Sequence, residues 1–389
     1  MTGGTPDKSK PEYFDGGEIK WLVSGDIHQK EVTDCEGRIT QSGLENSNAK
    51  YLPLDSVLMA LNGQGKTRGT VAILRTKATC NQSLVSITPK DKNELLPEYL
   101  YANLHGRYEE IRRITGDSGN DRRGLNMSLI KDIEIPVAPL PEQQRIVAIL
   151  DETFAGIATA TANVEKNLQN ARELFESTLQ AVFAEKDEGW IEHNKPLKDL
   201  CELIVDCEHK TAPTKEEGFP SIRTPNIGKG KLLLEGVYRV SEETYREWTR
   251  RAEPKPGDLI LAREAPAGNV AVIPENLKVC LGQRTVLIRP RPRIFLPEFL
   301  AWLLLQPRMQ QKLLEHSRGA TVQHVNMKDI RALDVGAIPP LAIQDEIISV
   351  INEAHEETQR LEYIYQHKLD MLAGLKQSIL QKAFAGELH

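Results

Sequence analysis

One long stretch of the chain occurs twice, and this repeat limits the possible folds more than any other feature. Residues 139–184 return as residues 340–385 at an offset of 201 residues. At that offset Gln143 aligns with Gln344, Ile146 aligns with Ile347, and Phe183-Ala184 aligns with Phe384-Ala385. A fixed period of this length indicates a duplicated structural unit.

Each copy predicts one long α-helix, because apolar or small side chains recur at alternating spacings of three and four residues, as in a coiled-coil seam. In the first copy these are Val147, Leu150, Phe154, Ile157, Thr161, Val164, Leu168, Ala171, Phe175, Thr178 and Val182. In the second copy the stripe is Ile347, Ile351, Ala354, Thr358, Leu361, Tyr365, Lys368, Leu372, Leu375 and Ile379, with Lys368 as its one charged member.

The length of these helices demands a partner. Pro141 lies in the first turn, where its missing N–H costs little, and Gly386 marks the end of the second helix. About 43 helical residues span about 64 Å, which is too long for a small globular core. The second copy supplies a partner of equal length.

The segments before the two helices repeat as well. LPEYL at residues 96–100 returns as LPEFL at 296–300, and Asn126-Met127 returns as Asn326-Met327. Short apolar runs at 56–61, 70–74 and 83–87 predict strands, and 96–104 predicts a helix. We therefore predict an α+β fold with two similar mixed α/β domains, separated by two long antiparallel coiled-coil helices in a pseudo-two-fold internal repeat. The expected boundaries are 1–138 for the first domain, 139–186 for the central helix, 187–338 for the second domain and 339–389 for the C-terminal helix.

The duplication is incomplete. The second domain has a lead-in, residues 189–205, which has no counterpart before Met1. Residues 2–6, TGGTP, resemble the interior of such a domain. We expect either that the N-terminus is truncated or that the missing strand is supplied from elsewhere.

Composition places the chain among ordinary cytoplasmic proteins. Its 389 residues are 27% charged and 40% apolar, and this length suggests two to three domains. We find no apolar run of membrane-spanning length and no signal-peptide pattern. The five cysteines are odd in number and scattered, as expected in a reducing compartment. Cys201, Cys207 and His209 have a poor spacing for zinc, so we interpret the cysteines as ordinary reduced ones.

The net charge of −6 hides an uneven distribution. Residues 1–140 carry −1, 141–189 carry −5, 190–339 carry +4 and 340–389 carry −4. The acidic residues are therefore concentrated on the two helices, where a solvated face accounts for them. The globular segments are still able to present local positive surfaces.

Enzyme motifs do not account for the chain. The sequence contains no G-x-S-x-G, H-E-x-x-H or P-loop pattern, and neither N-P-P-Y nor D-P-P-Y of adenine methyltransferases. Residues 62–69, NGQGKTRG, do not fit the phosphate-loop spacing. We therefore expect a non-catalytic protein.

The repeat and its motifs resemble the specificity (S) subunit of type I restriction–modification systems. The resemblance is carried by PLPEQQRI at residues 139–146, QSILQKAF at 377–384 with GEL at 386–388, TGGTP at 2–6 and the stretch 21–27. It covers essentially the whole chain. The missing lead-in before Met1 departs from the family pattern.

The resemblance implies a DNA-binding specificity subunit whose two target recognition domains each read one half of a bipartite double-stranded DNA sequence. It also implies partners: two modification (methyltransferase) subunits that bind AdoMet and methylate adenine, and restriction/translocase subunits that cut DNA. The S subunit itself then needs no cofactor. The helices would fix the spacer, so that inserting or deleting a turn in one helix changes the spacer and not the half-sites.

Base reading requires polar or basic side chains on loops that reach a groove. In the first domain the candidates are Gln64, Lys66, Thr67, Arg68, Asn120, Arg122 and Arg123, with His28 and Lys30 as weaker ones. In the second domain they are Arg223, Thr224, Asn226, Lys229, Arg263, Asn269, Arg284, Arg318, Thr321 and Gln323. For each of these residues, a solvated loop position without a DNA contact is as good an interpretation as base reading. We expect Arg68→Ala and Arg263→Ala each to weaken binding of their own half-site by about 1–3 kcal/mol.

A second hypothesis remains open at this point. In this hypothesis the chain is a non-catalytic coiled-coil scaffold whose globular domains bind protein partners and not DNA. The acidic helices and the modest basicity of the domains are compatible with it.

Overall fold

The computed structural model describes residues 1–63, 66–113, 124–184, 189–208, 210–317, 323–385 and 387. Contacts divide the chain into two units, Met1–Val164 with His367–His389, and Glu165–Gln366. This division crosses both long helices, because each end of the helix pair packs against the globular domain of its own unit. The two units are described separately.

The first domain contains two small sheets. One has the strand order β3 (Arg38–Ile39), β1 (Ile19–Leu22), β6 (Thr79–Cys80), and the other β2 (Glu31–Val32), β5 (Val71–Leu74), β4 (Val57–Ala60), β7 (Leu84–Ile87). The helices are α1 (Gln41–Glu45), α2 (Pro97–Gly106), α3 (Tyr108–Arg113) and α4 (Met127–Lys131), with 3-10 turns η1 (Pro11–Tyr13) and η2 (Ser24–Asp26).

The second domain repeats this plan and adds to it. Its sheets are β12 (Arg239–Val240), β10 (Phe219–Ile222), β15 (Cys280–Leu281), and β11 (Gly230–Lys231), β14 (Val270–Val272), β13 (Leu259–Ala262), β16 (Thr285–Pro290), β9 (Cys201–Asp206). A two-stranded sheet joins β8 (Ile191–Glu192) to β17 (Ala337–Ile338). The helices are α6 (Leu197–Leu200), α7 (Glu242–Trp248), α8 (Pro297–Leu305), α9 (Pro307–Leu314) and α10 (Met327–Ala332), with η3 (Thr224–Asn226) and η4 (Glu315–Ser317).

The two strand orders confirm the predicted duplication. In the larger sheets β2-β5-β4-β7 corresponds to β11-β14-β13-β16, with the same parallel and antiparallel pairings. Both central strands, β4 and β13, are buried on both faces, which is why they appear in the sequence as unbroken apolar runs. The turn before each strand contains a left-handed residue, Asp55 (φ 63°) in one domain and Gly257 (φ 82°) in the other.

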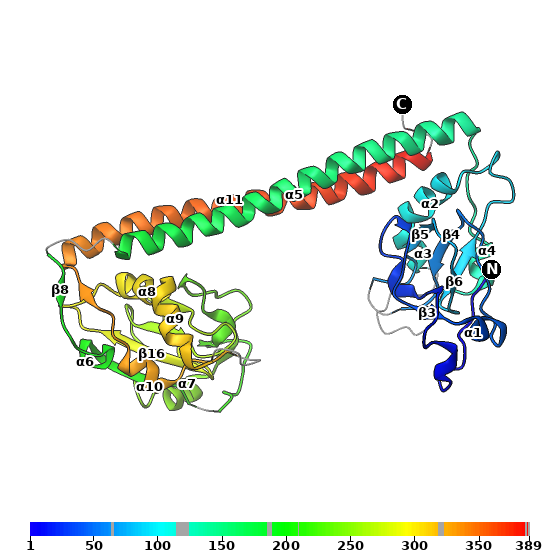
Figure 1. The fold of residues 1–389 in the computed structure, drawn as a ribbon. Helices are drawn as coiled ribbons and strands as arrows, with labels where there is room; N and C mark the ends of the chain where they lie inside the picture. Colours follow the sequence, from blue (N-terminus) through cyan, green and yellow to red (C-terminus); the bar gives the residue numbers. More distant parts are fainter. Residues whose placement is uncertain are drawn as a thin grey trace. The chain divides into compact units, whose positions relative to one another are not determined.

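Each domain is followed by a helix of 45 residues, α5 (Leu140–Ala184) and α11 (Leu341–Ala385). In the first unit Ile146 and Leu150 of α5 form a buried cluster with Leu380 and Ala383 of α11. In the second unit the C-terminal part of α5, with Phe175, instead packs near the N-terminal part of α11. The helices therefore run antiparallel, as Figure 1 shows within each unit.

The predicted seam is wrong at two positions, Lys368 and Leu375, which are both exposed. Leu375 is 48% exposed, whereas Leu380 and Ala383, outside the predicted stripe, are 3% and 1% exposed. The reason is that α2 packs against this end of the helix pair with Tyr99 and Ala102, so that the buried face turns toward the domain.

A buried glutamine attaches each long helix to its domain. The Gln143 side chain is fully buried; its Oε1 accepts from Leu96 N at 2.9 Å and its Nε2 donates to Glu94 O and Ala138 O, both at 2.7 Å. Gln344 makes the same three contacts with Leu296 N (2.8 Å), Ile294 O (2.7 Å) and Pro339 O (2.9 Å). Leu96 and Leu296 precede the prolines that begin α2 and α8, so this side chain satisfies a backbone donor at each helix start.

Candidate nucleic-acid interface

The connections of each larger sheet gather at one end of its strands, here called the loop edge. It comprises residues 61–63, 66–69, 81–83 and 124–126 in the first domain, and 263–269, 282–284 and 323–326 in the second. In the first domain Leu61 N donates to Ser83 O (2.8 Å) and Leu125 N donates to Leu61 O (2.9 Å).

The second domain repeats this ladder of backbone hydrogen bonds. Arg263 N donates to Arg284 O and Val325 N donates to Arg263 O, both at 2.8 Å. Arg263 therefore occupies the backbone position that Leu61 occupies in the first domain. The two loop edges share a framework and differ in their side chains.

In the first domain, α3 supports the predicted loop. Tyr108 Oη donates to Lys66 O at 2.6 Å, and Arg112 Nη1 donates to Tyr108 Oη at 2.6 Å. The Lys66 side chain is exposed, Thr67 is half-buried and Arg68 is only 8% exposed. Lys66 is thus the candidate of this loop that is most accessible to a ligand.

Six predicted residues lie outside the described part of the chain, and their placement stays a prediction: Gln64, Asn120, Arg122, Arg123, Arg318 and Thr321. The two weaker candidates do not join the loop edge. Lys30 forms an ion pair with Asp151 of α5 at 2.5 Å. The exposed His28 lines the same cavity as Lys30, between α2 and the long helices of the first unit.

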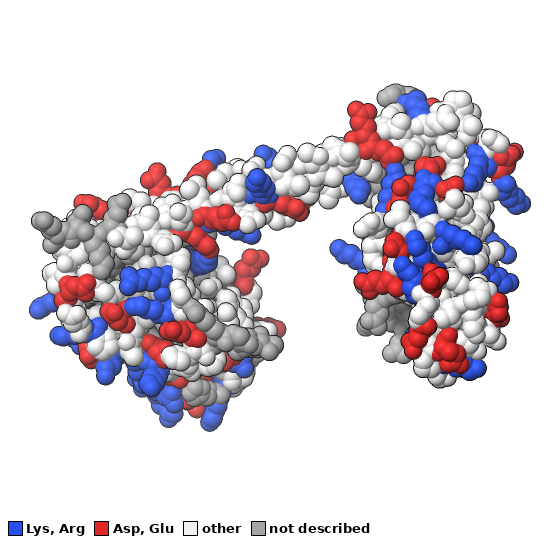
Figure 2. All heavy atoms as spheres, viewed as in Figure 1, with Lys and Arg blue, Asp and Glu red and all other residues white. Residues whose placement is uncertain are grey.

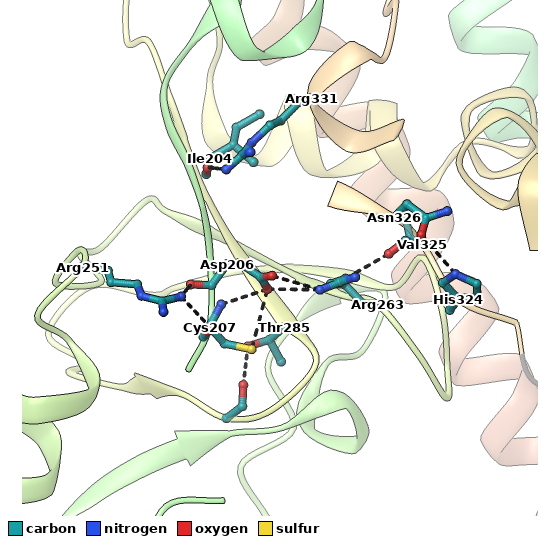
Figure 3. Close-up of polar contacts among 11 residues, drawn as sticks. Ile204, Asp206, Cys207, Arg251, Arg263, Thr285, His324, Val325, Asn326 and Arg331 are labelled. Carbon is teal, nitrogen blue, oxygen red and sulfur yellow. Dashed lines mark hydrogen bonds and ion pairs between the residues drawn. The ribbon is translucent and has the colours of Figure 1, made fainter. Parts of the chain in front are cut away.

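In the second domain, Arg263 is held by a carboxylate from β9. Its Nη1 lies 3.0 Å and 3.3 Å from the two oxygens of Asp206, and its Nε donates to Val325 O at 2.9 Å (Figure 3). Arg251 donates from the other side to Cys207 O at 3.1 Å. Arg263 keeps 21% of its side chain exposed, so it is oriented and only partly accessible.

The cysteine beside this network is not poised to react. Cys207 N donates to Asp206 Oδ1 at 3.0 Å, and the Cys207 side chain is 2% exposed. Burial raises the pKa of the Cys207 thiol above its ordinary value. The thiol therefore remains protonated near neutral pH, and thiolate chemistry is disfavoured.

Arg284 and Gln323 lie nearer the surface of the loop edge. Arg284 has a left-handed backbone (φ 63°), and its side chain is 63% exposed while paired with Glu264 at 2.9 Å. Gln323 is exposed. Neighbouring His324 and Asn326 are linked by a 3.1 Å contact between Nε2 and Oδ1.

The segment 223–229 joins the loop edge through two contacts. Asn269 Nδ2 donates to Ile227 O at 2.9 Å. The Arg223 side chain crosses Gly282 so closely that a Cβ there would lie 2.6 Å from Arg223 Cγ. Arg223 also lies over the Tyr238 ring, 5.2 Å from its centroid.

The other predictions in this segment differ in accessibility. Asn226 accepts from Arg223 N (3.1 Å) and donates to Leu233 O (3.2 Å), so it builds a turn. Thr224 is 8% exposed. Lys229 is exposed and faces Glu176 of α5 at 3.8 Å. The structure thus brings Arg223, Asn269, Arg263, Arg284 and Gln323 to one edge and assigns Asn226 a structural role as well.

Sequence reasoning missed the residues that support these candidates. Tyr108, Tyr238 and His324 carry no motif, and only contacts between distant segments identify them. Asn326 belongs to the Asn-Met pair that the sequence repeats, so the repeat could have identified it.

On the face shown in Figure 2, basic and acidic side chains are interspersed on both domains. Within the described residues, no helix is long and apolar enough to cross a membrane.

Duplicated α/β domains with different polar side chains on one loop framework, each joined to a long antiparallel helix, define a two-domain recognition protein. The family model of the type I restriction modification DNA specificity domain matches residues 1–169 and 190–366. The chain belongs to this family.

Relatives in sequence are specificity subunits, and solved structures share the fold of this chain. The chain is 24% identical to the type I restriction enzyme EcoBI specificity subunit of Escherichia coli, over 80% of this chain and 69% of that protein. It is 26% identical to the MjaIX specificity subunit of Methanocaldococcus jannaschii, over 63% and 58%. Its fold matches a chain from a structural study of type I R-M complex assembly (TM-score 0.78, 18% identity, 100% and 95% covered). It also matches the HsdS subunit of Thermoanaerobacter tengcongensis (TM-score 0.57, 18% identity, 100% and 95%).

Proposed function

We propose that this chain is the DNA-recognition subunit of a type I restriction–modification complex, in which each domain reads one half of a bipartite target. The observation that carries the proposal is the shared backbone ladder with different side chains, Leu61 in the first domain and Arg263 in the second. One framework with two sets of side chains suits two dissimilar half-sites. The long helices would set the spacer between them.

The chemistry of the second loop edge supports base reading. Arginine donates two hydrogen bonds to guanine, whereas the amide of asparagine or glutamine donates one hydrogen bond to adenine N7 and accepts one from adenine N6. Arg284 and Gln323 offer such groups at the surface, while Asp206 orients Arg263. In the first domain Lys66, on a loop supported by Tyr108, offers a cation for phosphate or base.

The partners in this proposal are two modification subunits, which supply AdoMet and adenine methylation, and restriction/translocase subunits. The chain itself binds no cofactor and catalyses no step, and it acts in the cytoplasm. The names of the relatives support this assignment, because they are specificity subunits of type I restriction enzymes.

A gel-shift titration on genomic fragments, with and without the modification subunits, tests the proposal. We expect specific binding in the assembled complex, weakened by about 1–3 kcal/mol in Arg284→Ala. The matched control is Arg246→Ala on α7, which removes an arginine whose side chain is 76% exposed and paired with Glu242. Absence of DNA binding in both preparations would favour the protein-binding scaffold.

A further inference from the structure

One ion pair lies at the surface of the second loop edge. Arg284 Nη1 lies 2.9 Å from Oε2 of Glu264, and the two side chains are 63% and 29% exposed. Both side chains are therefore accessible to a ligand. The pair presents hydrogen-bond donors and an acceptor of opposite charge side by side.

Backbone hydrogen bonds hold the two residues in place. Glu264 follows Arg263, whose N–H donates to Arg284 O at 2.8 Å. On its other side, Glu264 forms an antiparallel bridge with His324. The backbone that carries the ion pair is thus fixed before a ligand binds, as a recognition site requires.

The backbone conformation of Arg284 is costly. Its φ of 63° lies in the left-handed region, which is unfavourable for a residue with a side chain. Glycine adopts this conformation without steric cost, so stability does not account for an arginine at this position. Strained residues of this kind cluster at binding and active sites, where the surrounding structure maintains them.

The carboxylate of Glu264 determines which part of a DNA duplex suits the pair. A phosphate bound by Arg284 would lie close to this carboxylate, and the two negative charges would repel each other. The base edges carry no such charge. In the major groove, cytosine N4 donates to a glutamate, and guanine O6 and N7 accept from an arginine. These groups are neighbours in a G·C base pair, because cytosine N4 also hydrogen-bonds to guanine O6.

The ion pair leaves a suitable edge of the guanidinium for guanine. Nη1 of Arg284 faces Glu264. Nε and Nη2 carry parallel N–H groups on another edge of the same plane, and such an edge donates two hydrogen bonds to paired acceptors. One side chain then contacts guanine while the other contacts the cytosine of the same base pair.

We propose that Arg284 and Glu264 together read one G·C base pair in the half-site of the second domain. Arg284 donates to guanine O6 and N7, and Glu264 accepts from cytosine N4. Glu264 is then a specificity-determining residue of this domain. The inference rests on the proposed function, because it names the base pair that the same recognition site takes.

The first domain carries different chemistry at the equivalent points. Its backbone hydrogen bonds place Ser83 at the position of Arg284 and Asn62 at that of Glu264. Asn62 is exposed and Ser83 is half-buried, and neither side chain is charged. The requirement for this G·C base pair therefore falls in the half-site that the second domain reads.

Competition binding with base analogues tests the pair in the complex of this chain with its modification subunits. The duplex carries the target found by methylome sequencing, and each guanine in turn is replaced by 7-deazaguanine, which lacks the N7 acceptor. At one guanine the replacement should weaken binding by the parent chain about tenfold, because a charged donor loses its acceptor. It should not weaken binding by Arg284→Gly any further.

The cytosine opposite that guanine tests the second residue. N4-methylcytosine replaces the N4–H that points into the groove, so it should weaken binding by the parent chain and not by Glu264→Gln. Arg284→Gly also relieves the left-handed backbone, so its midpoint of unfolding in urea should not fall. The matched controls, Arg246→Ala and Glu242→Gln, break an ion pair on α7 whose side chains are 76% and 66% exposed, and they should retain both losses.

The outcomes separate this inference from DNA recognition itself. If the complex prefers its target but every guanine gives equal losses with the parent chain and Arg284→Gly, the G·C reading is wrong and DNA recognition stands. An N4-methylcytosine loss that persists in Glu264→Gln would overturn the role of Glu264. A parent complex without preference for its target would overturn the proposed function and this inference with it.

Discussion

The first and second domains place different side chains at equivalent points of one backbone ladder. Leu61 N and Arg263 N make corresponding hydrogen bonds, with Ser83 O and Arg284 O. The side chain of Arg263 is held by Asp206 on β9, whereas the residue that takes the place of Asp206 in the first domain is Thr2. Backbone hydrogen bonds therefore preserve the framework, so the side chains at the loop edge can differ between the two domains.

The largest expected effect comes from lengthening the helices, which leaves both domains intact. We would insert one heptad between Val164 and Glu165 and another between Gln366 and His367, the two points at which the chain passes from one unit to the other. Seven residues add about 10.5 Å of helix, close to three base pairs at about 3.4 Å each, and they preserve the seam. Methylated-site sequencing should show unchanged half-sites with a longer spacer. An unchanged spacer would contradict the role of the helices.

An ion pair distinguishes the two domains energetically. Arg289 donates to both oxygens of Asp258 (2.8 and 2.7 Å), and the Asp258 side chain is 3% exposed. In the first domain Asp55 pairs with Arg75 at 2.6 Å but is 26% exposed. Asp258→Asn should cost about 3 kcal/mol, because it leaves a largely buried guanidinium without its counter-charge. Asp55→Asn should cost less than about 1 kcal/mol.

Tryptophan fluorescence in urea measures this contrast, because Trp21 belongs to the first unit and Trp190, Trp248 and Trp302 belong to the second. Asp258→Asn should shift the transition reported by the second unit. Equal shifts for both variants would show that burial does not separate the two ion pairs.

The sequence predicted the fold closely because the fold depends on repeated local patterns. The expected helix at 96–104 corresponds to α2 (Pro97–Gly106), and the three expected strands correspond to β4, β5 and β7. The loop edge was less predictable. Asp206 and Arg263 are 57 residues apart, and no periodicity connects them.

The offset between the two domains is not constant along the loop edge, and the enclosed loops differ in length. Gly69 N donates to Ala60 O, whereas Gly268 N donates to Ala262 O, so the enclosed loops are residues 61–68 and 263–267. The 201-residue offset of the long helices would align Asn62 with Arg263, one residue away from the counterpart that the backbone hydrogen bonds give. Only the hydrogen-bond ladder shows that Leu61 is the counterpart of Arg263.

The buried glutamines provide a change that should affect both domains alike. Gln143→Leu removes the acceptor of Leu96 N and the donor to two backbone carbonyls, which should cost about 2 kcal/mol in the first unit. Gln344→Leu should cost about the same in the second unit. Gln144→Leu is the matched control, because Gln144 is exposed. Urea unfolding checks all three, and a clear inequality between Gln143→Leu and Gln344→Leu would mean that the junctions are not equivalent.

The smallest effect concerns acid sensitivity. His355 of α11 lies between Phe175 and Trp302, each 5.0 Å away between ring centroids, and burial with Lys231 and Lys229 lowers its pKa below 6.5. As the pH falls below 6.5 the unfolded chain takes up this proton first, so stability decreases.

His355→Phe should remove this part of the loss of stability at acid pH, because phenylalanine takes up no proton. Phenylalanine is chosen because Phe154 occupies the corresponding place in α5. Unfolding measured at pH 5 and pH 8 tests the change. His105 in the first unit, whose pKa is also lowered by burial, should retain its own contribution. A pH dependence identical to that of the parent chain would contradict the assignment to His355.

The most direct test of the central claim is methylome sequencing of a host that expresses this chain with the modification subunits of its system. Two domains with one framework and different loop side chains predict methylated adenines in a sequence of two dissimilar halves, separated by a spacer of constant length. A continuous recognition sequence, or two identical halves, would contradict the account.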